Sequence, residues 1–132
     1  MSEENVEIVR RGLERFLATG EVEWETFAED LEIEDHDIPE RGEYQGREGF
    51  LRWIEEWAVP WGEWSLEPQE FIDAGDRVIV IAHLTARGAG SGVQVERDDA
   101  LVYQLRDAMI ARLDYFNSRE QALQAVRQSG KS

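Results

Sequence analysis

The chain has 132 residues, of which 42% are apolar, and this length and composition predict one globular domain with a single core. Its 29 acidic and 14 basic side chains give a formal charge of −15, which disfavours contact with phosphate backbones, so no nucleic-acid partner is expected. Without cysteine there is no disulfide or thiolate metal site, and without an apolar run of about 18 residues no membrane span is expected. The first residues lack the basic and apolar regions of a signal peptide, so we expect a cytoplasmic location.

The first half of the chain is predicted to be mostly helical. Apolar side chains recur every three or four residues over 3–19, which predicts an amphipathic helix. A second short helix is predicted over 23–30, and a short strand over 31–37. A third helix is predicted over 47–58, with a stripe of large apolar side chains, and Pro60 ends it.

After Pro60 the period of the apolar residues changes from helical to strand-like. Four strands are expected, over residues 64–73, 77–87, 93–106 and 109–116. The strand over 77–87 is apolar on both faces, as a central strand is, while Pro68 in the preceding strand indicates an edge or a bulge. Ser118 is placed to cap a final helix, and residues 128–132 are expected to form a disordered tail.

Helices followed by a run of long strands predict an α+β fold. We expect a curved mixed or antiparallel sheet that wraps around the N-terminal helices as a cone, in one domain over residues 1–127. The inside of such a cone is a natural pocket for a small molecule.

Four short motifs carry a resemblance to a known family: Ile33-Glu34-Asp35, Gln45-Gly46-Arg47-Glu48, Ala74-Gly75-Asp76-Arg77-Val78 and Leu113-Asp114-Tyr115-Phe116. In this order and spacing the chain resembles the nuclear transport factor 2-like superfamily, and within it the SnoaL-like group of polyketide cyclases and ketosteroid isomerases. The resemblance implies a cystatin-like roll, a homodimer, and binding of a small, largely apolar organic molecule. No cofactor is expected, because no glycine-rich phosphate loop or metal constellation appears.

Asp35 is the first candidate catalytic residue. In ketosteroid isomerases, the strand before the Gly-Arg-Glu-type helix ends in an aspartate that moves a proton between carbons, and Asp35 stands at that position. Strand alternation places Asp35 on the side of Ile33, toward the apolar interior, where a carboxyl group can serve as a general base. The alternative is an exposed acid in a loop. At the positions of the isomerases' oxyanion donors the chain has Leu13 and, approximately, Leu101, which favours a non-catalytic member of the group.

His83 and Asp114 are further catalytic candidates. His83 interrupts the apolar central strand and could reach Asp114 across the sheet, or it is a core histidine with a satisfied hydrogen-bond partner. Asp114 either lines the pocket or pairs with Arg112. The segment around Asp114 also resembles limonene-type epoxide hydrolases, although His83 and Thr85 stand where their central-strand Arg-x-Asp pair is expected.

Several other side chains are candidates for binding the ligand. They are Trp53, Trp57, Tyr44, Arg97, Tyr103 and Phe116. The two tryptophans at helical spacing are otherwise core residues, and Arg97 is otherwise part of an ion pair at the end of a strand, with Asp99 nearby. His36 should lie on the face opposite Asp35, and with only two histidines in the chain no metal site is expected.

Three functions therefore remain open. The first is a cofactor-independent isomerase or cyclase that acts on an apolar substrate with Asp35 as the base. The second is a non-catalytic domain for binding apolar ligands or for dimerisation. The third is an epoxide hydrolase-like enzyme. Whether the protein is an enzyme at all is left open by its sequence.

Overall fold

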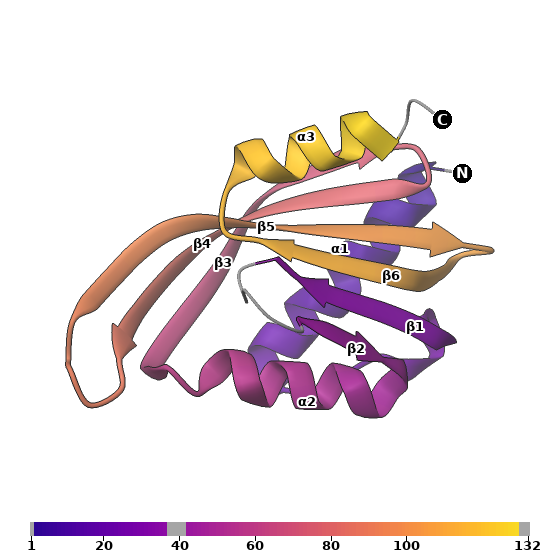
Figure 1. The fold of residues 1–132 in the computed structure, drawn as a ribbon. Coiled ribbons are helices and arrows are strands. Elements are labelled where there is room, and N and C mark those ends of the chain that lie inside the picture. Colours follow the sequence, from indigo (N-terminus) through magenta and orange to yellow (C-terminus); the bar gives the residue numbers. More distant parts are fainter. Residues whose placement is uncertain (1, 37–41, 130–132) are drawn as a thin grey trace.

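The computed structural model describes residues 2–36 and 42–129 (Figure 1). The helices are α1 (Ser2–Thr19), a 3₁₀ turn η1 (Trp24–Thr26), α2 (Gly46–Ala58) and α3 (Arg119–Ser129). The strands are β1 (Phe27–Asp35), β2 (Glu43–Gln45), β3 (Trp61–Ala74), β4 (Arg77–Gly88), β5 (Gln94–Arg106) and β6 (Met109–Phe116). The helices predicted at 3–19 and 47–58 and the four long strands are thus confirmed, with small shifts at their ends.

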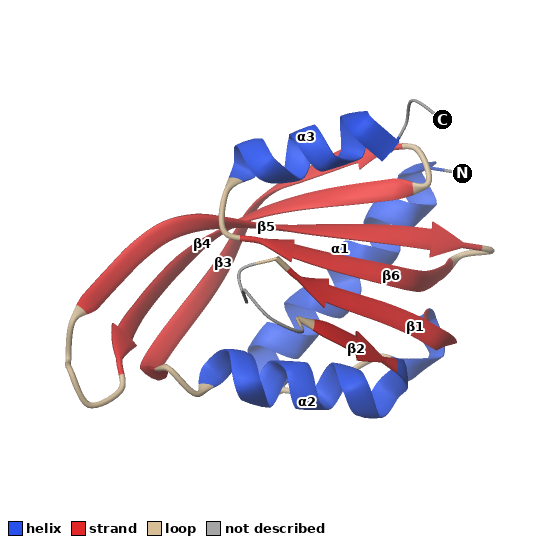
Figure 2. Cartoon of the chain, in the orientation of Figure 1, coloured by secondary structure: helices blue, strands red, loops and turns tan. Residues whose placement is uncertain are grey.

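The six strands form one mixed sheet in the order β2-β1-β6-β5-β4-β3. Only β1 and β6 pair in parallel, and the other neighbours are antiparallel. The sheet is curved and open, with α1 and α2 against one face and α3 against the other (Figure 2). The predicted α+β fold with a curved sheet around the N-terminal helices is confirmed.

The central strand β4 separates two apolar clusters. Val78, Val80 and Ala82 belong to the cluster that contacts α1 and α2, which we call the helical face of the sheet. Ile79 and Ile81 belong to a smaller cluster beneath α3, which we call the α3 face. Since β4 is buried on both sides over residues 78–82, its sequence there is continuously apolar.

Strand β3 forms an edge of the sheet, and its register shifts between Pro68 and Glu70. Proline cannot donate to a strand ladder, so both the edge position and the irregularity expected from Pro68 are confirmed.

The helix predicted over 23–30 is wrong. Only Trp24–Thr26 form a helical turn, and β1 begins at Phe27. The parallel ladder with β6 accounts for the difference, because it starts at the pair Phe27 and Ile110 and holds this segment extended. Strand β2 was missed because three residues are too few to show alternation.

Helix α3 begins as predicted. The Ser118 hydroxyl accepts a hydrogen bond from the backbone N–H of Gln121 at 3.2 Å, which caps the helix. The helix continues through Ser129, two residues into the segment expected as a tail, and residues 130–132 lie outside the described part of the chain. Asp37, the last residue of the predicted first strand, also lies outside it.

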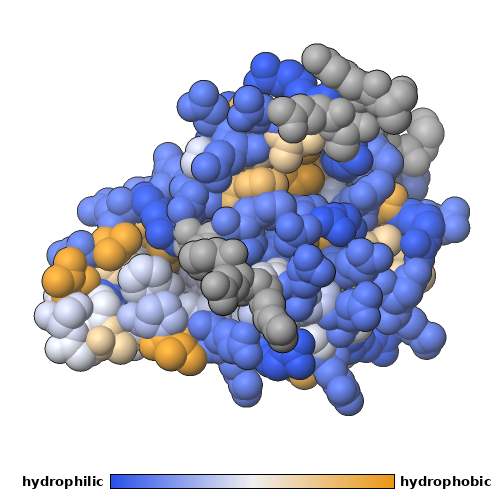
Figure 3. All heavy atoms as spheres, viewed as in Figure 1, coloured by the Kyte–Doolittle hydropathy of each residue, from blue (hydrophilic) through white to orange (hydrophobic). Residues whose placement is uncertain are grey.

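The surface is largely hydrophilic in the view of Figure 3, with apolar atoms gathered near the far end of the long strands and beneath α3. No helix within residues 2–36 and 42–129 is both long and apolar enough to cross a membrane.

Candidate ligand-binding site

A narrow cavity lies between α1, α2 and the helical face of the sheet. Its volume is about 60 Å³, and its lining is almost wholly apolar: Leu13, Phe16, Leu17, Phe50, Trp53, Ile54, Trp57, Trp64, Leu66, Leu101, Tyr103, Leu113 and Tyr115. At ~30 Å³ per water molecule this space corresponds to about two waters. Pockets for drug-sized ligands are larger, roughly 300 Å³ or more, so an organic ligand requires side chains of the lining to move.

Aromatic rings form one wall of this cavity. Trp53 and Trp57 on α2 contact the ring of Tyr115 edge to face, with centroid distances of 5.7 and 6.0 Å. Trp57 also meets Trp64 of β3 at 4.9 Å and nearly at a right angle. Trp64 is 36% exposed, so the cavity approaches solvent at this residue.

Asp35, at the end of β1, lies directly behind the aromatic wall. Its side chain is only 2% exposed, and its Oδ2 accepts a hydrogen bond from Trp53 Nε1 at 2.8 Å. Leu31 and Ile33 are buried on the same side of the strand, so the predicted alternation is confirmed. The structure therefore places Asp35 in the interior rather than in an exposed loop, one side chain away from the cavity.

A second buried carboxylate, Asp99 on β5, lies on the helical face and is fully buried. The hydroxyl of Tyr115 donates a hydrogen bond to Asp99, and Arg97 Nε donates another at 2.7 Å. Burial, followed by the charge of Asp99, raises the pKa of Tyr115 above its ordinary value. The Tyr115 hydroxyl thus remains protonated and places a polar group at the cavity wall.

The ion pair expected for Arg97 is confirmed: its partner is the fully buried Asp99, while Arg97 itself is 27% exposed. Sequence reasoning missed Tyr115 as a site residue. The signal was present, because Tyr115 alternates with the buried Leu113 along β6 and therefore shares its face.

His83 lies on the α3 face of the sheet, opposite the cavity. Its Nδ1 contacts Asp98 Oδ1 at 2.9 Å and its Nε2 contacts Glu96 Oε1 at 3.0 Å. The hydrogen bonds to Asp98 and then Glu96 raise the pKa of His83 above its ordinary value. The structure does not bring His83 together with Asp35.

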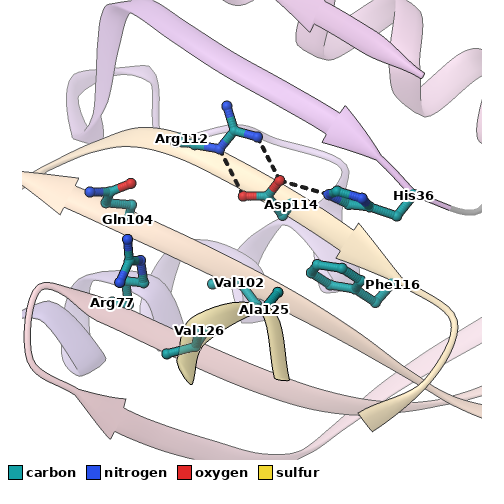
Figure 4. A pocket seen from close by; sticks show the side chains of 9 residues that line it. All are labelled: His36, Arg77, Val102, Gln104, Arg112, Asp114, Phe116, Ala125 and Val126. Atoms are coloured by element: carbon teal, nitrogen blue, oxygen red, sulfur yellow. Dashed lines mark hydrogen bonds and ion pairs between the residues drawn. The ribbon is translucent and has the colours of Figure 1, made fainter. Parts of the chain in front are cut away.

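Asp114 also lies on the α3 face. It accepts two hydrogen bonds from Arg112, at 2.9 and 2.8 Å, and its Oδ1 is 2.9 Å from His36 Nε2 (Figure 4). The hydrogen bond to Asp114 is the main cause that raises the pKa of Arg112. The ion pair between Asp114 and Arg112, considered from sequence, is confirmed. Asp114 is on the face opposite the cavity, so this arrangement does not favour the epoxide hydrolase hypothesis.

The candidate ligand-binding residues divide into two groups. Trp53, Trp57 and Tyr103 line the cavity. Tyr44 instead donates a hydrogen bond from its hydroxyl to Glu56 at 2.6 Å, and burial raises its pKa to about 12.

Arg97 and Phe116 do not line the cavity either. The Arg97 guanidinium lies 5.8 Å from the ring centre of Trp61. Phe116 is on the α3 face, where its ring stacks on His36 at 4.2 Å.

Among the described residues, one group of side chains has the geometry to hold a metal ion. The ligand atoms of Glu34, His36 and Asp114 all lie within 4.8 Å of one another. Arg112, however, contacts both Glu34 and Asp114 at 2.8 Å. The guanidinium of Arg112 thus already supplies these carboxylates with a positive charge. His36 lies on the face of the sheet opposite Asp35, as predicted.

The curved open sheet, with an apolar cavity under its helices, defines the class of nuclear transport factor 2-like folds, which solved structures share. Within this class, a family model described as a SnoaL-like domain matches residues 8–113, and the chain belongs to this family. No curated protein sequence matches the chain.

Solved structures with similar folds share little sequence with this chain. TerC, co-crystallised with polyporic acid, is 19% identical over 94% of this chain and 98% of its own, with a TM-score of 0.72. A protein from a Jannaschia species, assigned as a SnoaL-like polyketide cyclase, is 21% identical over 94% and 92%, with a TM-score of 0.71. A protein with a ketosteroid isomerase-like fold from Catenulispora acidiphila, in complex with trimethylamine, is 21% identical over 86% of both chains, with a TM-score of 0.70. At these identities the likeness establishes the fold alone.

Proposed function

We propose that the protein binds a small, largely apolar organic molecule in the aromatic cavity and moves a proton on it, as an isomerase or cyclase, with Asp35 as the base. The observation that carries the proposal is the buried Asp35 carboxylate, held at 2.8 Å by the indole of Trp53, which itself lines the cavity. TerC with polyporic acid and the Catenulispora protein with trimethylamine support a small organic ligand by analogy of fold.

In the structure as described, Asp35 cannot reach a ligand in the cavity. A general base must come within hydrogen-bond reach of the proton that it removes, and Trp53 separates Asp35 from the cavity. We propose that ligand entry turns the Trp53 side chain and moves Trp57 and Trp64, which enlarges the cavity and frees Asp35. The partly exposed Trp64 marks the side of entry.

Stabilisation of the enolate would depend on Tyr115. Leu13 and Leu101 both line the cavity and supply no hydrogen-bond donor. The neutral Tyr115 hydroxyl, which donates to Asp99 in the resting state, is a polar group on the wall that could donate to an oxyanion instead. Loss of one such donor typically costs about 3 kcal/mol of transition-state stabilisation.

The proposal is tested by proton exchange on a simple ketone. We expect the protein to accelerate deuterium incorporation at the α carbons of 2-tetralone, followed by NMR, and Asp35→Asn to remove roughly 100-fold or more of that acceleration. Glu34→Gln is the matched control, because Glu34 is the preceding residue of β1 and pairs with Arg112 on the other face. Equal rates for Asp35→Asn and the unmodified protein would reject Asp35 as the base.

A non-catalytic ligand carrier is the second candidate, favoured by Leu13 and Leu101 at the donor positions and by the small cavity. It predicts that 2-tetralone perturbs the NMR signals of cavity residues without exchanging its protons, and that Asp35 titrates as an ordinary carboxyl group. The enzyme proposal requires Asp35 to titrate nearer to neutral pH.

The expected homodimer is also a proposal. The resemblance to the family implies a homodimer, and the strand β4, which is apolar on both faces, agrees with a sheet covered on both sides, although α3 provides part of that cover within one chain. Size-exclusion chromatography with light scattering should give twice the mass of 15.2 kDa, and a mass of one chain would reject the dimer.

A further inference from the structure

A second cavity lies on the opposite face of the sheet, between β4, β5, β6 and α3 (Figure 4). Its volume is about 200 Å³, more than three times that of the cavity under α1 and α2. Its lining is mixed rather than apolar, with Arg77, Gln104 and Arg112 on the strands and Ala125 and Val126 on α3. Neither the SnoaL-like likeness nor the proposed proton transfer accounts for this space.

The sheet register sets the polar groups of this cavity in a row. Arg77 of β4 pairs with Gln104 of β5, and Gln104 pairs in turn with Arg112 of β6. Since neighbouring strands lie about 4.8 Å apart, the backbones of the two arginines are separated by roughly 10 Å with an amide side chain between them. This spacing leaves room for a small group between the two cationic side chains.

The two arginines differ in their partners. Arg112 contacts Glu32, Glu34 and Asp114, so its charge is neutralised within the protein. The side chain of Arg77 forms no ion pair, hydrogen bond or ring contact within the described part of the chain, although it is half-buried in a protein with 29 acidic residues. Removing a guanidinium partly from water without a partner is costly, and a bound anion would offset that cost.

The rest of the lining provides an apolar surface. Figure 4 shows Arg77 and Gln104 at one end of the cavity and Phe116 with His36 at the other, with Val102 between them. The Phe116 ring is fixed by stacking on His36, with an angle of 8° between the planes. The ligand that fits has one charged end and a compact apolar body.

We propose that this cavity binds a small monoanionic carboxylate, with its carboxylate on the Arg77 guanidinium and the Gln104 amide and its apolar body against Val102, Phe116 and α3. The planar fork of arginine matches a carboxylate in two parallel hydrogen bonds. A dianion such as phosphate fits less well, because the Asp114 carboxylate lines the same cavity and would repel it. At ~30 Å³ per water molecule the volume equals that of about seven waters, which suits a single ring with its acid group.

The test uses benzoate as the probe and the complete chain in an NMR titration. We expect shifts at Arg77, Val102, Gln104, Phe116 and Ala125, and none at the residues that line the cavity under α1 and α2. Arg77→Gln should weaken benzoate binding roughly tenfold or more, because a charge-assisted pair is lost. Arg87→Gln is the matched control, since Arg87 is on the same strand, exposed and outside this cavity. Benzamide, which has the same ring without the charge, should bind at least tenfold more weakly than benzoate.

Arg77 forms no ion pair or hydrogen bond with any other described side chain, so Arg77→Gln should keep the melting temperature of the unmodified protein. A second variant, Ala125→Leu, fills the apolar part of the cavity and should also abolish binding while Arg77 is present. Equal benzoate affinity in Arg77→Gln and the unmodified protein, equal affinity for benzamide, or no shifts with benzoate in large excess would each overturn the proposal. Shifts confined to Trp53, Trp57 and Leu13 would overturn it as well, and would assign the acid to the other cavity.

Discussion

At the scale of single residues, two buried acids on the helical face, Asp35 and Asp99, are held by hydrogen bonds from neighbouring side chains. Asp35 is bound by the indole of Trp53 on α2, and Asp99 by Tyr115 on β6 and Arg97 on its own strand. A buried charge without hydrogen bonds would destabilise the fold. These contacts therefore stabilise the two buried acids and also hold their side chains in position. The two buried acids of this site therefore require the aromatic side chains, Trp53 and Tyr115, that donate hydrogen bonds to them.

Replacing Trp53 with phenylalanine tests this dependence. The variant keeps a ring in the wall but removes the N–H that donates to Asp35, so we expect a loss of about 1–3 kcal/mol in the free energy of unfolding, measured with urea. Trp24→Phe is the control, because Trp24 packs against Phe27 and Phe50 through its ring. Equal losses in the two variants would mean that only ring packing matters. Combining Trp53→Phe with Asp35→Asn should cost less than the sum of the two single changes.

His83 predicts a pH dependence of stability. Its contacts with Asp98 and Glu96 raise its pKa in the folded state, so its contribution is fully present below the unfolded value of about 6.5 and is lost as pH rises through the folded pKa. We therefore expect His83→Gln to lower the melting temperature more at mildly acidic pH than at alkaline pH. Comparison with the unmodified protein at each pH removes the background from the many carboxylates. A difference that is the same at all pH values, or larger at alkaline pH, would contradict this sign.

At the scale of elements, alternation along a strand predicts which residues share a face but not what covers that face. Alternation along β4 places His83 on the same face as Ile79 and Ile81, and this is the α3 face rather than the face with the aromatic cavity. Asp114, for which the sequence leaves open a place in the pocket or a pair with Arg112, also lies on the α3 face, where it pairs with Arg112. Which face carries the aromatic cavity depends on helices that pack from distant parts of the chain, and the local sequence does not determine their position.

Where a feature is local, the sequence predicts it well. Pro68 marks an edge strand, Ser118 caps α3, and Asp35 follows the buried side of β1. The helix expected over 23–30 fails because its aromatic spacing suits a helix as well as a turn that leads into a strand, and the distant β6 decides between them.

The hairpin between β5 and β6 offers a test at this scale. Its two turn residues, Asp107 and Ala108, both have positive φ angles, 53° and 64°. A two-residue turn of this kind favours glycine, and alanine there costs about 1–2 kcal/mol. Since glycine also costs about 0.4–1 kcal/mol of unfolded-state entropy, we expect Ala108→Gly to stabilise the protein by roughly 0.5–1 kcal/mol.

Urea unfolding measures this gain, and Ala111→Gly is its control, because Ala111 is inside β6 and has no positive φ angle. There glycine brings only its entropy cost and should destabilise the protein. A loss of stability with Ala108→Gly would show that the turn holds no strain that glycine can relieve.

At the scale of the whole molecule, charge acts against the compact state. The formal charge of −15 is spread over a chain of 132 residues, and folding brings these like charges together. Many acids are paired locally, such as Glu21 with Arg15 and Asp30 with Arg106, but the acidic residues outnumber the basic ones by two to one, 29 against 14. Within residues 2–36 and 42–129 the half-buried Arg77 forms no ion pair, so the cavity beside it is a suitable place for an anion.

This imbalance predicts that salt stabilises the fold. The Debye length falls from about 30 Å at 0.01 M salt to about 8 Å at 0.15 M, which screens repulsion across the molecule before it weakens pairs in direct contact. Exposed ion pairs contribute only about 0–1 kcal/mol each, so their weakening should not outweigh the relief of repulsion. We expect the melting temperature to rise over this range with sodium chloride and equally with choline chloride, whose bulky cation separates screening from specific sodium binding. Sucrose at the same osmolality controls for changes in solvation. A melting temperature that falls with both salts would mean that the local ion pairs, rather than the net charge, dominate the electrostatics of this protein.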